Sequence, residues 1–308
     1  MSATLLRALA CGVLASLLAP LSSAQIQSTM IGGNLLVWGG NAPNSVSITG
    51  TGGTLTVIGN GATTINGVPA VTFDGVTGAL VVRLGGGDDA LFLSQAQLPG
   101  GAFLSTAGGD DLVYVAQNQV QGHLVVDGGA ASVAGDLLVL SDGNGVGNAV
   151  TGSLVVGASW ATVVVRGSLI GQDLAVRTGF GTDQIKIDGC SVGGDLVVDS
   201  NGGDDLVDLG SLDLAVGNGI AGSLRVDAGS GNDDVRVGAV NGGSTTIGGT
   251  SAILLGYGAD HLRIRQANFV GAALLRGGRG VDAAELQSPA YANVFGAGVD
   301  LGDFELQQ

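Results

Sequence analysis

The chain has 308 residues, of which 58 are Gly, 45% are hydrophobic and 12% are charged, and its formal net charge is −15. Gly at this level without a three-residue period excludes collagen, and so apolar a composition excludes acidic disorder. Lys186 is the only Lys, so the chain offers no basic face for nucleic acid or anionic lipid. All acidic residues except Glu285 and Glu305 are Asp, a residue typical of turns and of hard-cation sites.

Residues 1–24 have the organisation of a signal peptide. Arg7 precedes the apolar run ALACGVLASLLAPL, and SSA (22–24) supplies small residues before a cleavage site. Cleavage before Gln25 would remove Arg7 and no acidic residue, which changes the net charge from −15 to −16. No later run is long and apolar enough to span a membrane. We therefore expect export to the cell surface or the medium, with Cys190 as the only cysteine left and no intrachain disulfide.

Residues 25–79 consist of short alternating segments separated by Gly or Asn. The segments are NLLVWGG, SVSITG, TLTVIGNG and AVTFDG. Alternation of apolar and polar residues between turn residues is typical of β-strands. We expect this region to form the first coils of a β-structure or an N-terminal β cap.

Residues 80–288 carry a repeated Gly-x-Asp triplet. Its aspartates recur at a nearly regular spacing except for one long gap, between Asp111 and Asp183, which degenerate copies around Asp136 and Val163 divide. We expect Val163 to occupy the Asp position of its copy and so to interrupt the row of aspartates. Apolar residues stand two and four places after every one of these aspartates, which indicates strands of period two. The seven aspartates are Asp89, Asp111, Asp183, Asp205, Asp233, Asp260 and Asp282.

Each repeat contains a strand, a Gly-rich turn with its Asp, a second strand and a return segment such as GCSVGG or NQVQGH. Two such strands cannot bury their inner face alone, whereas coils stacked about 4.8 Å apart share a continuous core. We predict an all-β fold, a parallel β-helix or β-solenoid with about 22 residues per coil. Because an open end would expose unpaired strand edges, we expect caps at both ends, the second formed by residues 289–308.

The best copies of the repeat follow the pattern x-G-x-G-x-D-x-U-x, where U is apolar. They are LGGGDDALF (84–92), TGFGTDQIK (178–186), AGSGNDDVR (228–236), LGYGADHLR (255–263) and GGRGVDAAE (277–285). This pattern resembles the nonapeptide repeat of RTX (haemolysin-type) calcium-binding proteins, over about seven copies. The resemblance implies that the seven aspartates and the turn carbonyls bind several Ca²⁺ ions. In the family a motif lies on both sides of a shorter coil, so calcium would line only one edge here.

The residues themselves leave two interpretations of the Gly-x-Asp turn open. Gly supplies a positive φ and Asp accepts a backbone N–H, so the turn needs no metal. A stacked Asp column has one sign, however, and like charges about 5 Å apart repel by about 0.8 kcal/mol even in water. A divalent cation would remove this repulsion, and oxygen-only donors favour Ca²⁺ over zinc.

Three classes of function follow. The first is a secreted, non-catalytic, calcium-stabilised solenoid with a structural, cell-surface or adhesive role, whose partner is a cell-surface or matrix polysaccharide or protein. The second is a polysaccharide-active, pectate-lyase-like β-helix enzyme, in which Arg177, Arg263 or Arg276 would act beside calcium ligands. The third is an ice- or mineral-binding face, which would need a flat, regular array of Thr or Asp. The sequence contains no G-x-S-x-G, P-loop, Cys-x-x-Cys or HExxH motif, and we assign no catalytic residue.

Overall fold

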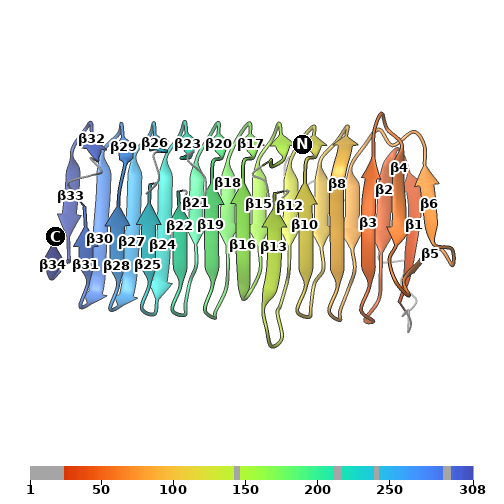
Figure 1. Ribbon diagram of the computed structural model, residues 1–308, viewed down its shortest axis with the longest axis horizontal. Coiled ribbons are helices and arrows are strands. Elements are labelled where there is room, and N and C mark those ends of the chain that lie inside the picture. The colour runs from red at the N-terminus through yellow and green to blue at the C-terminus, as the bar shows by residue number, and fades with distance from the viewer. Residues whose placement is uncertain (1–23, 142–145, 211–216, 239–242, 287–292, 308) are drawn as a thin grey trace.

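The computed structural model describes residues 24–141, 146–210, 217–238, 243–286 and 293–307. These residues form strands and turns and contain no helix. The strands lie across the long axis of the molecule, and the chain proceeds along this axis from the N-terminal strands at one end to the C-terminal strands at the other (Figure 1). The predicted all-β solenoid is confirmed. The predicted signal peptide lies outside the described residues except for Ala24.

Each coil contributes one strand to each of three parallel ladders, which we call the first, second and third faces. On the first face every strand pairs with the strand one coil later, and the row continues at its N-terminal end into β2, β1 and β5. The first-face strands are β7 (Leu80–Arg83), β9 (Ala102–Ser105), β12 (Leu124–Asp127), β15 (Leu154–Gly157), β18 (Leu174–Arg177), β21 (Leu196–Asp199), β24 (Leu224–Ser230), β27 (Ser251–Gly258), β30 (Ala273–Gly280) and β33 (Val299–Gly302).

The second face follows the Gly-rich turn, and the third face is the short return segment. β8 belongs to both of these faces, since its first half pairs with β10 and its last residues pair with β11. The second-face strands are β3 (Ser45–Gly50), β8 (Ala90–Leu98), β10 (Leu112–Ala116), β13 (Asp136–Leu140), β16 (Ala161–Arg166), β19 (Gln184–Asp188), β22 (Leu206–Leu209), β25 (Asp234–Val237), β28 (His261–Ile264), β31 (Ala283–Glu285) and β34 (Leu306–Gln307). The third-face strands are β11 (Gln119–Val120), β14 (Ala149–Val150), β17 (Leu169–Ile170), β20 (Ser191–Val192), β23 (Gly219–Ile220), β26 (Thr245–Ile247), β29 (Ala267–Phe269) and β32 (Val294–Phe295).

The coils are longer on average than the sequence repeat indicates, and they vary in length. Asp89 and Asp111, which stack in adjacent coils, stand 22 apart in the sequence. In other adjacent coils the separation is only 20, between Asn148 and Ser168, or as much as 30, between Asn118 and Asn148. The mean is about 25 residues per coil. Parallel pairing tolerates this variation because only the strands need to stay in register, while the turns between them absorb added residues.

Alternation along the strands builds the core. In β24, for example, Leu224 and Val226 are buried while Arg225 between them is exposed. The inward residues of all three faces join one hydrophobic cluster that runs from Ile26 to Ala284. Because inward Leu, Val and Ile of one coil lie against those of the next, the core is continuous along the stack.

The N-terminal strands depart from parallel stacking. β1 (Gln25–Ile31) pairs antiparallel with β2 (Asn34–Trp38), and β3 pairs antiparallel with β4 (Leu55–Gly59), which pairs antiparallel with β6 (Ala70–Phe73). β5 (Thr64–Ile65) lies beside β1. These hairpins precede the first regular coil, so the parallel ladder begins against antiparallel strands.

The corner between the second and third faces contains a row of buried asparagines. Asn118 Oδ1 accepts the Ala96 N–H at 2.8 Å, and Asn148 Oδ1 accepts the Asn118 N–H at 3.2 Å. Each side-chain amide also donates to a backbone carbonyl, Asn118 to Leu93 at 3.0 Å and Asn148 to Val115 at 2.9 Å. We call this row the asparagine corner. The side chains of Asn118 and Asn148 thus use both their acceptor and their donor, so neither buried amide is left unpaired.

The described part of the chain contains neither a membrane-spanning helix nor a disulfide. No helix there is long and apolar enough to cross a membrane. Cys190 is a free thiol, 2% exposed, and forms no disulfide among the described residues. Burial raises the pKa of the Cys190 thiol to about 12, so it packs as a small apolar residue.

Candidate functional site

A Gly-rich turn that ends in the motif Asp connects the first face to the second face in most coils. In the copy between β24 and β25, Gly229 and Gly231 have φ values of +99° and +136°. A Cβ on these glycines would lie 1.8 Å from the Asn201 carbonyl oxygen and 1.9 Å from the Gly203 carbonyl oxygen of the preceding coil. Gly is therefore required twice over, for its backbone conformation and for the close stacking of successive turns.

The motif aspartates are brought together in one row by this stacking. Each is at most 3% exposed, and in most coils its Oδ1 accepts the backbone N–H of the aspartate one coil earlier. The N···O distances in this row include 2.7 Å from Asp89 N to Asp111 Oδ1 and 2.9 Å from Asp205 N to Asp233 Oδ1. We call the row the aspartate ladder, and its members are Asp89, Asp111, Asp136, Asp183, Asp205, Asp233, Asp260 and Asp282.

All seven aspartates predicted from the motif belong to the ladder, together with Asp136, which the sequence indicated only as a degenerate copy and not as a site residue. Asp136 Oδ1 accepts the Asp111 N–H at 3.0 Å, so Asp136 is a full member although its turn lacks the Gly-x-Gly pattern. The signal for it in the sequence was the apolar pair at Leu138 and Leu140, two and four residues later, both of which are buried.

The interruption of the row was assigned to the wrong residue. The sequence placed Val163 at the Asp position, whereas β16 pairs Ala161 with Asp136 and Val163 with Ile185, which puts Ala161 there. Val163 instead points into the core, since apolar burial and not the lost Asp sets the register. The Ala161 N–H still donates to Asp183 Oδ1 at 2.6 Å, but the Asp136 N–H donates to the Trp160 carbonyl at 2.9 Å.

Both ends of the ladder are closed by other residues. At the N-terminal end the Asn44 N–H donates to Asp89 Oδ1 at 2.7 Å. At the C-terminal end the Asp282 N–H donates to Glu305 Oε2 at 2.7 Å, so a glutamate replaces the aspartate in the last coil. The row of caps thus extends one coil beyond the repeated motif at each end.

Among the described residues, the second carboxylate oxygen of every ladder aspartate is buried and accepts no hydrogen bond of ordinary geometry, although the hydroxyls of Thr106, Thr178 and Ser200 act to lower the pKa of Asp111, Asp183 and Asp205. Burial raises the pKa of Asp89, Asp136 and Asp233 to about 7 and that of Asp205 and Asp260 to about 6, and neighbouring aspartates add to the effect. The pKa values of the other three members are also raised, again mainly by burial. A buried carboxylate without a partner favours its neutral form.

A second row of acids lies outside the ladder and bonds in the opposite direction. Asp88 Oδ1 accepts the Asp110 N–H of the next coil at 3.0 Å, and Asp204 Oδ1 accepts the Asn232 N–H of the next coil at 2.7 Å. Asp110 accepts several N–H groups of 132–135, which lower its pKa. In an Asp-Asp pair such as Asp88–Asp89, one carboxylate therefore binds the following coil and the other binds the preceding coil.

The ladder provides hydrogen-bond caps more readily than metal ligands. Calcium takes about six to eight oxygen ligands. Each ladder aspartate commits Oδ1 to a backbone N–H, which leaves one carboxylate oxygen per turn besides the turn carbonyls. Among the described residues no group of three or more His, Cys, Asp or Glu is placed to hold a metal ion. The donors are all oxygen, as calcium requires, and calcium binding stays a prediction of the motif.

The arginines considered for a lyase are paired with acids outside the ladder. Arg177 Nε lies 3.0 Å from Asp199 Oδ2, and Arg276 Nη2 lies 2.7 Å from Asp300 Oδ2, both on the first face. Arg263, on the second face, lies 3.9 Å from Glu285. The three candidates are thus spread over two faces, where each neutralises a surface carboxylate.

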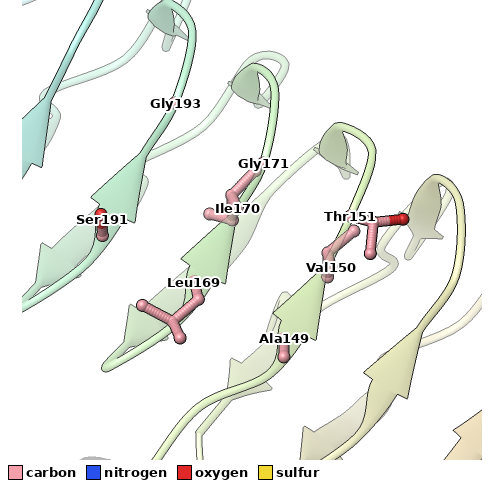
Figure 2. Close-up of a pocket in the computed structure, with 8 residues that line it drawn as sticks. All are labelled: Ala149, Val150, Thr151, Leu169, Ile170, Gly171, Ser191 and Gly193. Atoms are coloured by element: carbon pink, nitrogen blue, oxygen red, sulfur yellow. The ribbon is translucent and has the colours of Figure 1, made fainter.

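A shallow groove of about 430 Å³ lies on the third face. Figure 2 shows its side chains on successive coils, with Leu169 between the neighbouring strands. Leu169 is 61% exposed. The lining residues are Ala149, Val150, Thr151, Leu169, Ile170, Gly171, Ser191 and Gly193. None of them has a titratable side chain, so the groove lining supplies neither a general acid nor a general base.

Comparison with known proteins finds no matching family model, no similar curated protein and no similar solved structure.

Proposed function

We propose that this chain is an exported, non-catalytic β-solenoid with a structural role at the cell surface or in an extracellular matrix, including adhesion. The observation that carries the proposal is the aspartate ladder, a row of eight buried carboxylates whose hydrogen bonds connect coil to coil. In such a row the carboxylates hold successive turns together by accepting backbone N–H groups of the preceding coil. The apolar segment at the N-terminus supports export.

Fractionation of cells that express the full chain tests this proposal. We expect a processed protein that begins at Gln25, located in the cell envelope or the medium. An unprocessed protein in the cytoplasm would contradict export. Depolymerisation of an acidic polysaccharide, abolished by Arg263→Ala or Arg276→Ala, would favour the enzyme instead.

Calcium is a second candidate for the ladder, because within the described part of the chain eight buried carboxylate oxygens accept no hydrogen bond of ordinary geometry. A cation drawn into the turns would neutralise them, as a proton also would. Calorimetric titration with CaCl₂ at pH 8, together with melts in CaCl₂ and in chelator, separates the two. Heat of binding and a higher melting temperature in CaCl₂ would support calcium. No heat and identical melts would leave hydrogen-bond capping alone.

A further inference from the structure

One column of turn residues faces outward along the solenoid and changes character partway along it. In most turns the column is the residue three places before the ladder aspartate, and parallel bridges connect Gly86 to Gly108 and Gly108 to Ala130 in the N-terminal coils. In the C-terminal half the same register connects five residues, which we call the turn-edge strip: Phe180, Gly202, Ser230, Tyr257 and Arg279. Gly, Ala and Ser satisfy this position elsewhere, so the turn itself requires no aromatic side chain.

The two aromatic rings of the strip are presented to solvent. Phe180 is 85% exposed and Tyr257 is 58% exposed. The Phe180 ring lies beside the next coil, since a Cβ on Gly202 would be 3.2 Å from Phe180 Cδ1. The Arg279 guanidinium lies 5.5 Å from the centre of the Tyr257 ring and orients it. Rings held in this way against a backbone without bulky side chains offer flat apolar surfaces.

Polar groups occupy the space between the rings. Ser230 is exposed on the strip, and Asp204 and Asn232 are exposed beside it and hydrogen-bonded to each other at 3.2 Å. Phe180 and Tyr257 are three coils apart, which is about 14 Å at the usual strand spacing. The strip therefore has an apolar ring at each end and hydroxyl, amide and carboxylate groups between them. A saccharide chain is complementary to this arrangement, because its rings have apolar faces and hydroxyl groups at their edges.

We propose that the turn-edge strip binds an extended neutral polysaccharide lying along the solenoid axis. The net charge of −15 and the exposed Asp204 disfavour polyanionic glycans, because like charges would have to be brought together. Aromatic side chains dominate the affinity of surfaces that combine them with polar groups. This inference deepens the adhesive role proposed above and rests on the chain being extracellular.

Pull-down of the purified chain with insoluble cellulose, chitin, β-1,3-glucan and starch, and with cross-linked polygalacturonate, tests the strip. We expect binding to at least one neutral glycan and weaker binding to polygalacturonate. The double variant Phe180→Ala/Tyr257→Ala should lose about tenfold or more of that affinity. Leu169→Ala, which removes an equally exposed apolar side chain on the third face, should bind like the unaltered chain.

Three outcomes would overturn the strip as a glycan site. These are binding to none of the neutral glycans, equal binding by the double variant, and tighter binding to polygalacturonate than to every neutral glycan. A melt of the double variant that matches the unaltered chain confirms that loss of binding is not loss of folding. Because export is tested by fractionation, a surface-located chain that binds no glycan would overturn the strip and leave the structural role standing.

Discussion

At the residue scale, the ladder aspartates resemble the asparagines of the opposite corner but lack a donor. Asn218 Oδ1 accepts the Cys190 N–H at 2.9 Å, and its amide donates to the Ile187 carbonyl at 2.7 Å. Asp233 Oδ1 accepts an N–H in the same manner, but its other oxygen remains without a partner. A charged oxygen buried in this way costs more than a neutral amide in the same place.

Asp233→Asn should therefore stabilise the protein at pH 8. The Asn retains the acceptor for the Asp205 N–H and removes the buried charge, so we expect the free energy of unfolding to rise by about 2 kcal/mol. Denaturant unfolding at pH 8 in chelator measures this. The gain should shrink at pH 5, where Asp233, with a pKa of about 7, is already protonated in the folded state.

Asp233→Ala serves as the matched control. It removes the charge and the acceptor together, which leaves the buried Asp205 N–H unpaired, and it should be less stable than Asp233→Asn by about 1–3 kcal/mol. If Asp233→Asn were instead destabilising, and only when CaCl₂ is present, the carboxylate would be acting as a calcium ligand.

The sequence predicted only some of the residues that occupy the ladder position in successive coils. Seven ladder aspartates follow from the repeat because the Gly-x-Asp turn and the apolar residues after it agree on one alignment. Ala161 could not be placed, since its turn has neither the glycines nor the Asp and the strand alternation allows two registers. Pairing of Val163 with Ile185 across adjacent coils resolves this, and such pairing is not visible within one repeat.

At the scale of elements, the Gly-rich turns and the asparagine corner hold the strands at two of the corners. Gly256 has a φ of +106°, and a Cβ there would lie 2.0 Å from the Gly229 carbonyl oxygen. Gly256→Ala should destabilise the protein by about 2–4 kcal/mol, because strain and a steric clash with the preceding turn act together. Thermal melts would measure the change.

Gly52→Ala is the matched control for that substitution. Gly52 also has a positive φ, +62°, but nothing lies within 4 Å of its Cβ position. Only the strain of a positive φ applies to Ala at this position, so we expect the free energy of unfolding to fall by about 1 kcal/mol. Equal effects of the two substitutions would mean that the close stacking of turns does not limit the fold.

The asparagine corner gives a second test at this scale. Asn148→Ala removes the acceptor of the Asn118 N–H and side-chain amide and the donor to the Val115 carbonyl, all of them buried. We expect a loss of about 2–4 kcal/mol in urea unfolding. Gln119→Ala, on an exposed outward position of the neighbouring strand, should change stability by less than about 0.5 kcal/mol.

The strands of the third face were not predicted as strands from the sequence. Segments such as NQVQGH and GCSVGG were expected as return segments, and they contain β11 and β20, each of two residues. Alternation needs several residues to be recognised, so a two-residue strand leaves no pattern of its own. These strands exist because the neighbouring coils supply their hydrogen-bond partners.

At the scale of the whole molecule, the ladder makes stability depend on pH. Asp89, Asp136 and Asp233 have folded-state pKa values of about 7, above the ordinary value of 3.8. The folded state therefore binds protons more tightly than the unfolded state. Stability from these groups is fully present below pH 3.8 and is lost as the pH rises toward 7. The acids with lowered pKa values, such as Asp300 beside Arg276, act in the opposite direction at low pH.

We accordingly expect a higher melting temperature at pH 5 than at pH 8 in chelator, and little change above pH 8. Melts in CaCl₂ at the two pH values extend the test, since a bound cation would raise the value at pH 8 selectively. A melting temperature that rises from pH 5 to pH 8 in chelator would show that the ladder carboxylates are charged and well solvated in the folded protein.

The solenoid as a whole was accessible from the sequence because one pattern recurs many times. Repetition identifies stacking even where single copies are degenerate. The division of each coil into three faces and the antiparallel strands at the N-terminal end were not accessible. They depend on which strands pair across coils, and such partners, for example Leu124 and Leu154, are well separated in the chain and unevenly spaced along it.

The interruption at Ala161 has a mechanical consequence. The row of side-chain caps is divided there into a run of three aspartates, Asp89 to Asp136, and a run of five, Asp183 to Asp282. At the joint between the Asp136 coil and the Ala161 coil the side-chain cap is replaced by a backbone bond, from the Asp136 N–H to the Trp160 carbonyl at 2.9 Å. Under tension along its axis the molecule should part first at this joint, so that two blocks of unequal length come apart in separate force steps.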